Sequence, residues 1–254
     1  MILCIVQARV SSSRLPGKVL KPILGKPMIV HELERLKRSK RIDKIVLATS
    51  QDESDDGLAG IVVNNGFEIY RGSLEDVLDR YYQCAKQYRP EHVVRITGDC
   101  PVIDWQIVDT VIEKHLKEGN DYTVTTDRFP DGLDTEVFRF YALERAWKEA
   151  MLPSEREHVT QYFRKHAEIF KSGQMDCKNN FEAMRWTVDE SRDFEFIQQV
   201  YEELYPGNMD FAMNDILELL VKRPQLQFIN DGIIRNEGLQ ISLQKEKTIG
   251  GWTR

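Results

Sequence analysis

The stretch Ala8-Arg9-Val10-Ser11-Ser12-Ser13-Arg14-Leu15-Pro16-Gly17-Lys18 directly follows a short apolar run, residues 2–6. The run predicts a buried strand, and the stretch after it predicts a loop at the carboxyl end of that strand. In an open α/β sheet, ligands bind at this edge. The loop offers backbone N–H groups, hydroxyls and three cations together, and this combination suits a polyphosphate ligand. We therefore interpret it as a phosphate-binding loop, although Gly25-Lys26 does not fit the standard P-loop pattern. The alternative interpretation is a solvated turn.

The composition is that of an ordinary soluble globular protein. The chain has 254 residues, is 41% hydrophobic and 30% charged, and carries a net charge of −6. This charge argues against nonspecific binding to nucleic acid or to an acidic membrane, so the basic loop indicates a local site for a small anion. The first apolar run is too short for a signal peptide or a membrane span, and we expect a cytoplasmic protein. The four cysteines have no metal-ligand spacing and predict reduced thiols.

Short β-rich runs alternate with helical patterns along the chain, which predicts an α/β fold with a doubly wound, mostly parallel sheet. Apolar residues at helical spacing predict helices over 74–85, 107–116 and 194–204. The predicted strands cover residues 2–6, 44–49, 67–70, 92–96, 122–125 and 184–188.

The alternation breaks between about residues 129 and 175, where a turn-rich stretch precedes a strand-like run at 135–140 and two helices. We predict one domain over 1–254, with an insertion or dimerisation arm at 129–175. Residues 236–254 have no sustained period, which predicts an extended tail. Because closed twofold pairing is the commonest assembly, we expect a homodimer.

Two acids each follow directly from a predicted strand. Asp99 comes after the strand at 92–96, and Asp189 comes after the strand at 184–188. Both are therefore expected at the same sheet edge as the basic loop. Mg²⁺ is usually held by one or two carboxylates together with substrate phosphates, so the pair predicts a Mg²⁺ site. For Asp189, a cap on the helix that begins near Ser191 is an equal alternative.

Three ordered motifs resemble those of the CMP-sugar-acid cytidylyltransferases. Ala8-Arg9 to Lys18 resembles the family's Ala-Arg-x-x-Ser-x-Arg-x-Pro-x-Lys signature, most closely in the 3-deoxy-manno-octulosonate type. Thr97-Gly98-Asp99-Cys100-Pro101 is similar to its Gln-Gly-Asp-Glu-Pro metal motif, and residues 186–193 are similar to the segment with its second metal aspartate. The likeness covers residues 1 to about 195. It is strongest to the spore-coat polysaccharide branch, in Arg71-Gly72-Ser73 to Tyr81, Pro130-Asp131-Gly132-Leu133-Asp134 to Phe138, and Arg156-Glu157-His158-Val159-Thr160.

The resemblance implies the Rossmann-like fold of nucleotide-diphospho-sugar transferases and transfer of CMP from CTP to an acidic sugar or similar acid, with pyrophosphate released, in surface glycan synthesis. Mg²⁺ would bind Asp99 and Asp189. Arg9, Arg14, Lys18 and Asp99 would be catalytic. The predicted nucleotide-binding residues are Ala8, Arg9, Ser12, Ser13, Arg14, Lys18, Arg71, Arg80 and Thr97, and the predicted acceptor residues are Asp131, Asp134, Glu136, Glu157, His158 and Arg185.

Some residues depart from the family pattern and leave alternatives open. Thr97 and Cys100 replace the Gln and Glu of the octulosonate-type motif, so the motif does not identify the acceptor. A surface cation remains an alternative for Arg80, and a structural ion pair for Arg185. A metal-dependent glycosyltransferase of the same fold is a second interpretation, although the Asp-x-Asp motif is missing at Asp99. A non-catalytic nucleotide-binding paralogue is a third.

Overall fold

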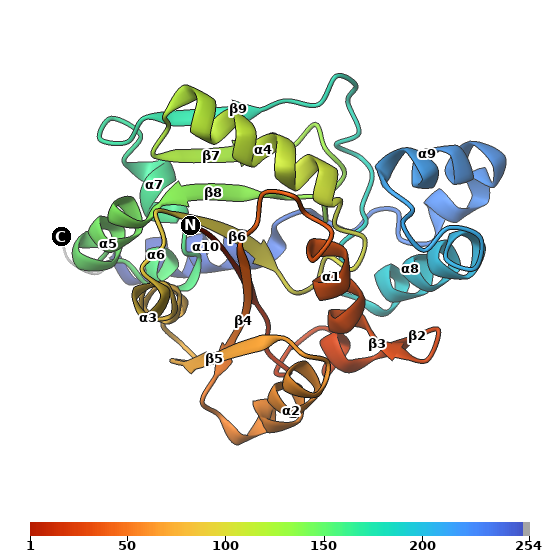
Figure 1. Ribbon diagram of the computed structural model, residues 1–254, viewed down its shortest axis with the longest axis horizontal. Coiled ribbons are helices and arrows are strands. Elements are labelled where there is room, and N and C mark those ends of the chain that lie inside the picture. Colours follow the sequence, from red (N-terminus) through yellow and green to blue (C-terminus); the bar gives the residue numbers. More distant parts are fainter. Residues whose placement is uncertain (251–254) are drawn as a thin grey trace.

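A seven-stranded, mostly parallel sheet forms the centre of the chain, in the order β5-β4-β1-β6-β8-β7-β9 (Figure 1). The computed structural model describes residues 1–250. Strands β5, β4, β1 and β6 are mutually parallel, whereas β8 runs antiparallel to both of its neighbours. The strands of this sheet are β1 (Ile2–Gln7), β4 (Lys44–Ser50), β5 (Glu68–Gly72), β6 (His92–Thr97), β7 (Tyr122–Thr125), β8 (Glu136–Arg139) and β9 (Ser172–Met175), and a small hairpin pairs β2 (Pro22–Ile23) with β3 (Lys26–Pro27).

Helices cover both faces of the sheet and divide the interior into two cores. Cys4 and Val6 of β1 belong to one core, together with α1, α2, α4, α8 and α9, whereas Leu3 and Ile5 belong to the other, together with α3, α5 and α7. This alternation follows from the period of two along a strand. The helices are α1 (Met28–Leu36), α2 (Asp56–Asn64), α3 (Val77–Tyr88), α4 (Trp105–Glu118), α5 (Phe140–Glu149), α6 (Pro153–Glu157), α7 (Gln161–Lys165), α8 (Ser191–Leu204), α9 (Met213–Lys222) and α10 (Glu237–Gly250).

The predicted α/β class is confirmed, and the strands expected at 2–6, 44–49, 67–70, 92–96 and 122–125 correspond to β1, β4, β5, β6 and β7. The strand predicted at 184–188 is wrong. This segment makes only one isolated bridge, between Asp131 and Arg185, because it pairs with a turn instead of a strand. β9, whose sequence Ser-Gly-Gln-Met lacks β-branched residues, was not predicted.

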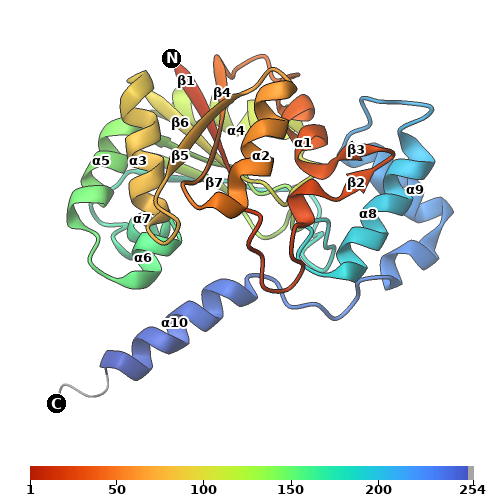
Figure 2. The ribbon, with the colours of Figure 1, turned by 90° about the horizontal axis from the view of Figure 1, so that it is seen from below.

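The irregular segment at 129–175 lies within the body of the protein, because β8, β9 and α5 to α7 all fall inside it. The extended tail predicted at 236–254 is wrong for its described part. Residues 237–250 form α10, which Figure 2 shows below α6 and α7. Glu237 in the first turn suits the helix dipole, and Leu, Gln, Lys and Glu are good helix formers. Residues 251–254 lie outside the described part.

Candidate active site

A cleft of about 1140 Å³ opens where β1 and β6 end. The β1 loop, the start of α3, α6 and α10 also form its walls. Its position agrees with the rule that open α/β sheets bind ligands beyond the carboxyl ends of their strands. Most of the residues predicted to bind nucleotide or metal line it, namely Ala8, Arg9, Ser12, Ser13, Arg14, Lys18, Arg80, Thr97, Asp99 and Asp189.

Lys18 lies at the centre of the charged part of the cleft. Its Nζ donates hydrogen bonds to Asp99 Oδ2 at 3.0 Å, to Asp189 Oδ1 at 2.9 Å and to the carbonyl oxygen of Val188 at 2.6 Å. The side chain is only 9% exposed. Burial by itself would lower the pKa of Lys18, but the charges of Asp99 and Asp189 outweigh it and raise this pKa. Lys18 is therefore a fixed cation, held by two carboxylates.

Close backbone packing brings the two acids together. Gly98 lies beside the end of β1, and a Cβ atom on it would be 2.8 Å from Cβ of Ala8. Only glycine allows this approach. Across the cleft, the backbone N–H of Val188 donates to the carbonyl oxygen of Asp99 at 2.8 Å. Arg185 then donates to Asp189 Oδ2 at 2.8 Å and so orients the second carboxylate.

The donor set at this point fits Mg²⁺. Asp99 and Asp189 each direct one oxygen at the same Lys18 ammonium, so these oxygens lie close enough to serve one cation. Mg²⁺ prefers hard oxygen ligands, and it needs only one or two carboxylates when substrate phosphates complete its shell. No cluster of three or more acidic, histidine or cysteine ligands occurs within residues 1–250. A metal here would therefore depend on the bound substrate.

Asp55, which the sequence did not single out, holds the basic loop in place. It is fully buried, and it accepts hydrogen bonds from the backbone N–H of Val10 at 2.7 Å and from the Thr49 hydroxyl at 2.8 Å. Burial would raise the pKa of Asp55, but the hydrogen bonds, first that from Ser50, lower it. An ionised carboxylate thus fixes the loop to the end of β4.

Two arginines supply cationic atoms that are not engaged by carboxylates. Arg9 is exposed and forms no ion pair in the described part of the chain. Arg80 is 2% exposed, and its Nη1 donates to the carbonyl oxygen of Ser73 at 3.0 Å. Arg80 Nε is buried with no hydrogen-bond partner among residues 1–250. A buried unpaired guanidinium nitrogen is costly, so this wall of the cleft favours an acceptor-rich or anionic ligand.

Arg71 lies outside this arrangement. Its guanidinium pairs with Asp56 at 2.6 Å and donates to the carbonyl oxygens of Ser50 and Asp52. These contacts face the loop between β4 and α2, and Arg71 is not among the residues that line the cleft. Its predicted contact with a nucleotide stays a prediction.

Of the six predicted acceptor residues, Glu157 and His158 line the cleft. The other four are not among the lining residues and are engaged in ion pairs. Glu136 is 3% exposed, and it is bound by Arg95, Arg164 and Tyr122. Asp131 pairs with Arg185 at 2.6 Å, and Asp134 pairs with Arg235 at 2.8 Å. Arg185 also contacts Asp189 and Asp193, which agrees with the alternative of a structural ion pair.

A buried carboxyl lies behind Asp99. Glu32 of α1 has no exposed surface, and its Oε2 accepts a hydrogen bond from the backbone N–H of Cys100 at 3.1 Å. Burial raises the pKa of Glu32 well above its usual range, and this buried carboxyl supports the loop through its bond with Cys100. Burial also raises the pKa of the Cys100 thiol, which argues against its use as a nucleophile.

Helix α10 forms a wall of the cleft that the sequence did not predict. Glu237, Gly238, Ile241, Ser242 and Glu246 line the cleft from this helix. Their spacing of about four residues is helical, but only Ile241 among them is a large apolar side chain. The usual apolar stripe that reveals a packed helix is therefore missing.

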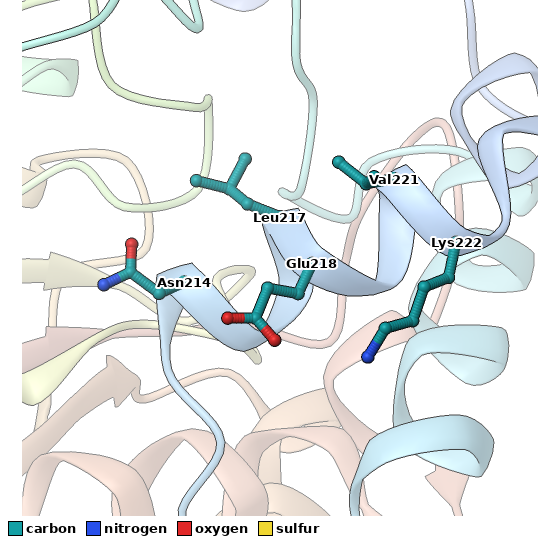
Figure 3. A pocket seen from close by; sticks show the side chains of 5 residues that line it. All are labelled: Asn214, Leu217, Glu218, Val221 and Lys222. Carbon is teal, nitrogen blue, oxygen red and sulfur yellow. The ribbon is translucent and has the colours of Figure 1, made fainter.

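A second hollow, of about 510 Å³, lies on the surface of α9. Figure 3 shows that its side chains all project from this one helix. It contains a single carboxylate and a single ammonium, so it lacks the convergent charges of the first cleft. The lining residues are Asn214, Leu217, Glu218, Val221 and Lys222. Across residues 1–250, no helix is long and apolar enough to cross a membrane.

Comparisons with known proteins agree with the motifs. A sequence model described as cytidylyltransferase matches residues 3–228. The chain is 34% identical over 230 residues to the spore coat polysaccharide biosynthesis protein SpsF of Bacillus subtilis, which covers 88% of this chain and 95% of that protein. It is 39% identical over 111 residues to a 3-deoxy-manno-octulosonate cytidylyltransferase of Anaeromyxobacter, over 42% of this chain and 44% of that enzyme. The solved structure of a cytidylyltransferase from Leptospira borgpetersenii has a TM-score of 0.86 and 31% identity, and the match covers 92% of this chain and 99% of that one.

Proposed function

The chain belongs to the cytidylyltransferase family, and from this premise we propose that it transfers CMP from CTP to a small acidic acceptor and releases pyrophosphate. The acceptor oxygen attacks the α-phosphorus, the bond from this phosphorus to the β-phosphate oxygen breaks, and the acceptor proton passes to solvent. No covalent enzyme intermediate is required, which agrees with a buried, protonated Cys100.

The observation that carries the proposal is the convergence of cations and carboxylates at one end of the cleft. Arg14 donates to Asp189 Oδ1 at 2.9 Å, and Lys18 contacts both Asp189 and Asp99. A triphosphate needs both cations and a divalent metal, and this group of residues can supply the first and hold the second. Few other ligands require cations so close to carboxylates that can hold a metal ion.

Each residue of this group has a proposed task. Arg9, Arg14 and Lys18 would bind the β- and γ-phosphates, and they would stabilise the charge that develops on the leaving pyrophosphate. Asp99 and Asp189 would hold Mg²⁺, which when bound neutralises phosphate charge and polarises the phosphoryl oxygens. Arg80, with its unpartnered Nε, would contact an oxygen of the nucleotide.

The acceptor would lie between α6 and the metal-binding carboxylates, because Glu157 and His158 line this part of the cleft. Carboxylate and imidazole groups suit the hydroxyls of a sugar acid. The name of the Bacillus subtilis relative supports a role in the synthesis of a surface polysaccharide. A homodimer stays a prediction.

Calorimetric titration of the full chain in Mg²⁺ with CTP, UTP, GTP and ATP tests the proposal. We expect CTP to bind most tightly. Pyrophosphate release should then be measured with CTP against sugar acids, phosphonates and neutral sugar phosphates. Equal affinity for all four nucleotides, or tighter binding of a nucleotide sugar, would contradict the proposal and favour a binding module or a glycosyltransferase.

A further inference from the structure

Helix α10 lies over the cleft and contacts the residues that we assign to both substrates. It begins at Glu237, beyond residue 228, where the match to the family model ends. Figure 2 shows the helix below the body, next to α6. Its position is therefore a feature of this chain that the family match does not account for.

The first contact places a carboxylate on a phosphate-binding cation. Glu237 Oε2 accepts a hydrogen bond from Arg14 Nη1 at 3.0 Å, while Arg14 Nη2 contacts Asp189 at 2.9 Å. Both terminal nitrogens of this guanidinium are thus occupied by carboxylates. A phosphate that binds Arg14 would compete with Glu237, because a carboxylate left beside a polyphosphate would repel it.

The second contact places a hydroxyl on the proposed acceptor residues. Ser242 Oγ donates to Glu157 Oε2 at 2.8 Å, and it lies 3.1 Å from His158 Nε2. These are the interactions that a sugar hydroxyl could make with the same two side chains. Ser242 and Glu237 both line the cleft, so one helix occupies both parts of it.

We propose that α10 is an intramolecular competitor that covers the active site, with Glu237 in the place of a substrate phosphate and Ser242 in the place of an acceptor hydroxyl. The inference rests on the proposed function, because it assigns a regulation to the same site. Binding of substrates displaces the helix from Arg14, Glu157 and His158. The covered state then predominates when the substrate concentration is low.

The attachment of α10 permits such displacement. Its described side chains belong to neither hydrophobic core, and two hydrogen bonds join it to α6. The contact between Ser242 and Glu157 is exposed, and such a contact stabilises weakly because water competes for it. Arg235, two residues before the helix, is anchored by Asp134 at 2.8 Å and by the carbonyl oxygen of Phe129 at 3.1 Å. Asn236 follows with a positive φ of 57°, so the helix leaves from a fixed point.

A pair of matched variants tests the proposal that α10 competes with the substrates. Pyrophosphate and CTP are titrated separately, each with Mg²⁺, into the wild-type chain, Glu237→Gln and Glu195→Gln. Glu195 is an exposed carboxylate on α8, so its substitution changes the net charge equally without touching the cleft. We expect Glu237→Gln to bind both ligands about three- to tenfold more tightly than wild type, whereas Glu195→Gln binds them like wild type. Equal affinity of Glu237→Gln and wild type would overturn the proposal.

Hydrogen exchange on the wild-type chain gives a second readout. We expect the backbone amides of residues 240–250 to exchange faster when pyrophosphate or CTP is bound, because the displaced helix loses its contacts. Slower exchange would show a lid that closes on the ligand, and unchanged exchange would show a fixed wall; each result overturns the proposal. If pyrophosphate produces the expected effects but CTP is not preferred over other nucleotides, the proposed function is wrong, whereas the proposal that α10 competes with ligands is supported. If CTP is preferred but Glu237→Gln behaves like wild type, only the proposal that α10 competes with ligands is wrong.

Discussion

The two walls of the cleft are built in different ways. The wall at the ends of β1 and β6 carries buried charge, because the Lys18 side chain is 9% exposed and binds two carboxylates. The wall formed by α6 and α10 is held by partly exposed polar contacts, such as that between Ser242 and Glu157. Removing one partner of a buried ion pair costs much stability, whereas removing one partner of an exposed contact costs little. The sheet-edge wall is therefore suited to fixed chemistry, and the α10 wall to movement.

This comparison predicts large effects for substitutions in the sheet-edge wall. Asp99→Asn should lower turnover by roughly a thousandfold, because charge stabilisation by a metal ion is worth several kcal/mol. The fold should survive, since the Asp99 side chain is 25% exposed and Lys18 keeps its ion pair with Asp189. Steady-state kinetics over a range of Mg²⁺ concentrations measures the loss, and circular dichroism checks the fold.

Asp210→Asn is the matched control for this substitution. Asp210 is 65% exposed and pairs with Arg38 away from the cleft, so turnover should stay at the wild-type level. If Asp99→Asn retains most of its activity at saturating Mg²⁺, Asp99 does not hold the metal. The sheet-edge wall would then not be the metal-binding part of the cleft.

Lys18→Ala separates binding from catalysis in the same wall. If Lys18 stabilises the leaving pyrophosphate, its interaction strengthens in the transition state, so kcat should fall more than CTP affinity does. Loss of such a contact is worth about 3 kcal/mol, or on the order of a hundredfold in kcat. Kinetics and calorimetry on Lys18→Ala, with the exposed Lys40→Ala as control, measure the two effects. An unchanged kcat would mean that Lys18 only neutralises Asp99 and Asp189.

The same difference explains what could be predicted from the sequence. Apolar β-rich runs set the positions of β1 and β6, and parallel strands bring their carboxyl ends to one edge. The basic loop and Asp99 were therefore placed correctly at the cleft. Asp189 was also placed there, although the strand predicted before it is wrong. Its segment is held by a hydrogen bond from Val188 N–H to the carbonyl oxygen of Asp99, so the residue reaches the cleft without a strand.

The α10 wall could not be predicted because its position depends on contacts between distant residues. Ser242 contacts His158, and Glu246 contacts Ser154, both across more than 80 positions in the chain. Neither contact leaves a periodic pattern in the sequence. Asp55 was missed for a similar reason, since its side chain accepts a hydrogen bond from the backbone N–H of Val10, 45 positions away in the chain. Patterns of burial along one element are visible in a sequence, whereas polar contacts between elements are not.

The buried ion pairs of Glu136 on β8 should contribute strongly to the stability of the sheet. Arg95 and Arg164 contribute to lowering the pKa of Glu136 to about 2, against the burial that would raise it. Because the folded-state pKa lies below the usual value of 4.5, the carboxylate stabilises the fold above pH 4.5, and this contribution is lost as the pH falls toward about 2. Glu136→Gln should therefore lower the free energy of unfolding at pH 7 by on the order of 3 kcal/mol. Urea denaturation at several pH values should show the difference from wild type shrinking below pH 4.5; a difference independent of pH would contradict this account.

Glu246→Gln is the matched test of the α10 wall, and it should have the smallest effect. Glu246 accepts a hydrogen bond from the backbone N–H of Ser154 and lies 3.7 Å from Lys165 Nζ, whose side chain is 31% exposed. Since glutamine retains an oxygen that can accept from Ser154, the substitution mainly removes a weak ion pair. The free energy of unfolding should fall by less than about 1 kcal/mol. The urea series used for Glu136→Gln measures it under the same conditions. If Glu246→Gln destabilises the chain as much as Glu136→Gln does, α10 is held as firmly as the sheet, and the distinction between a fixed wall and a movable one is lost.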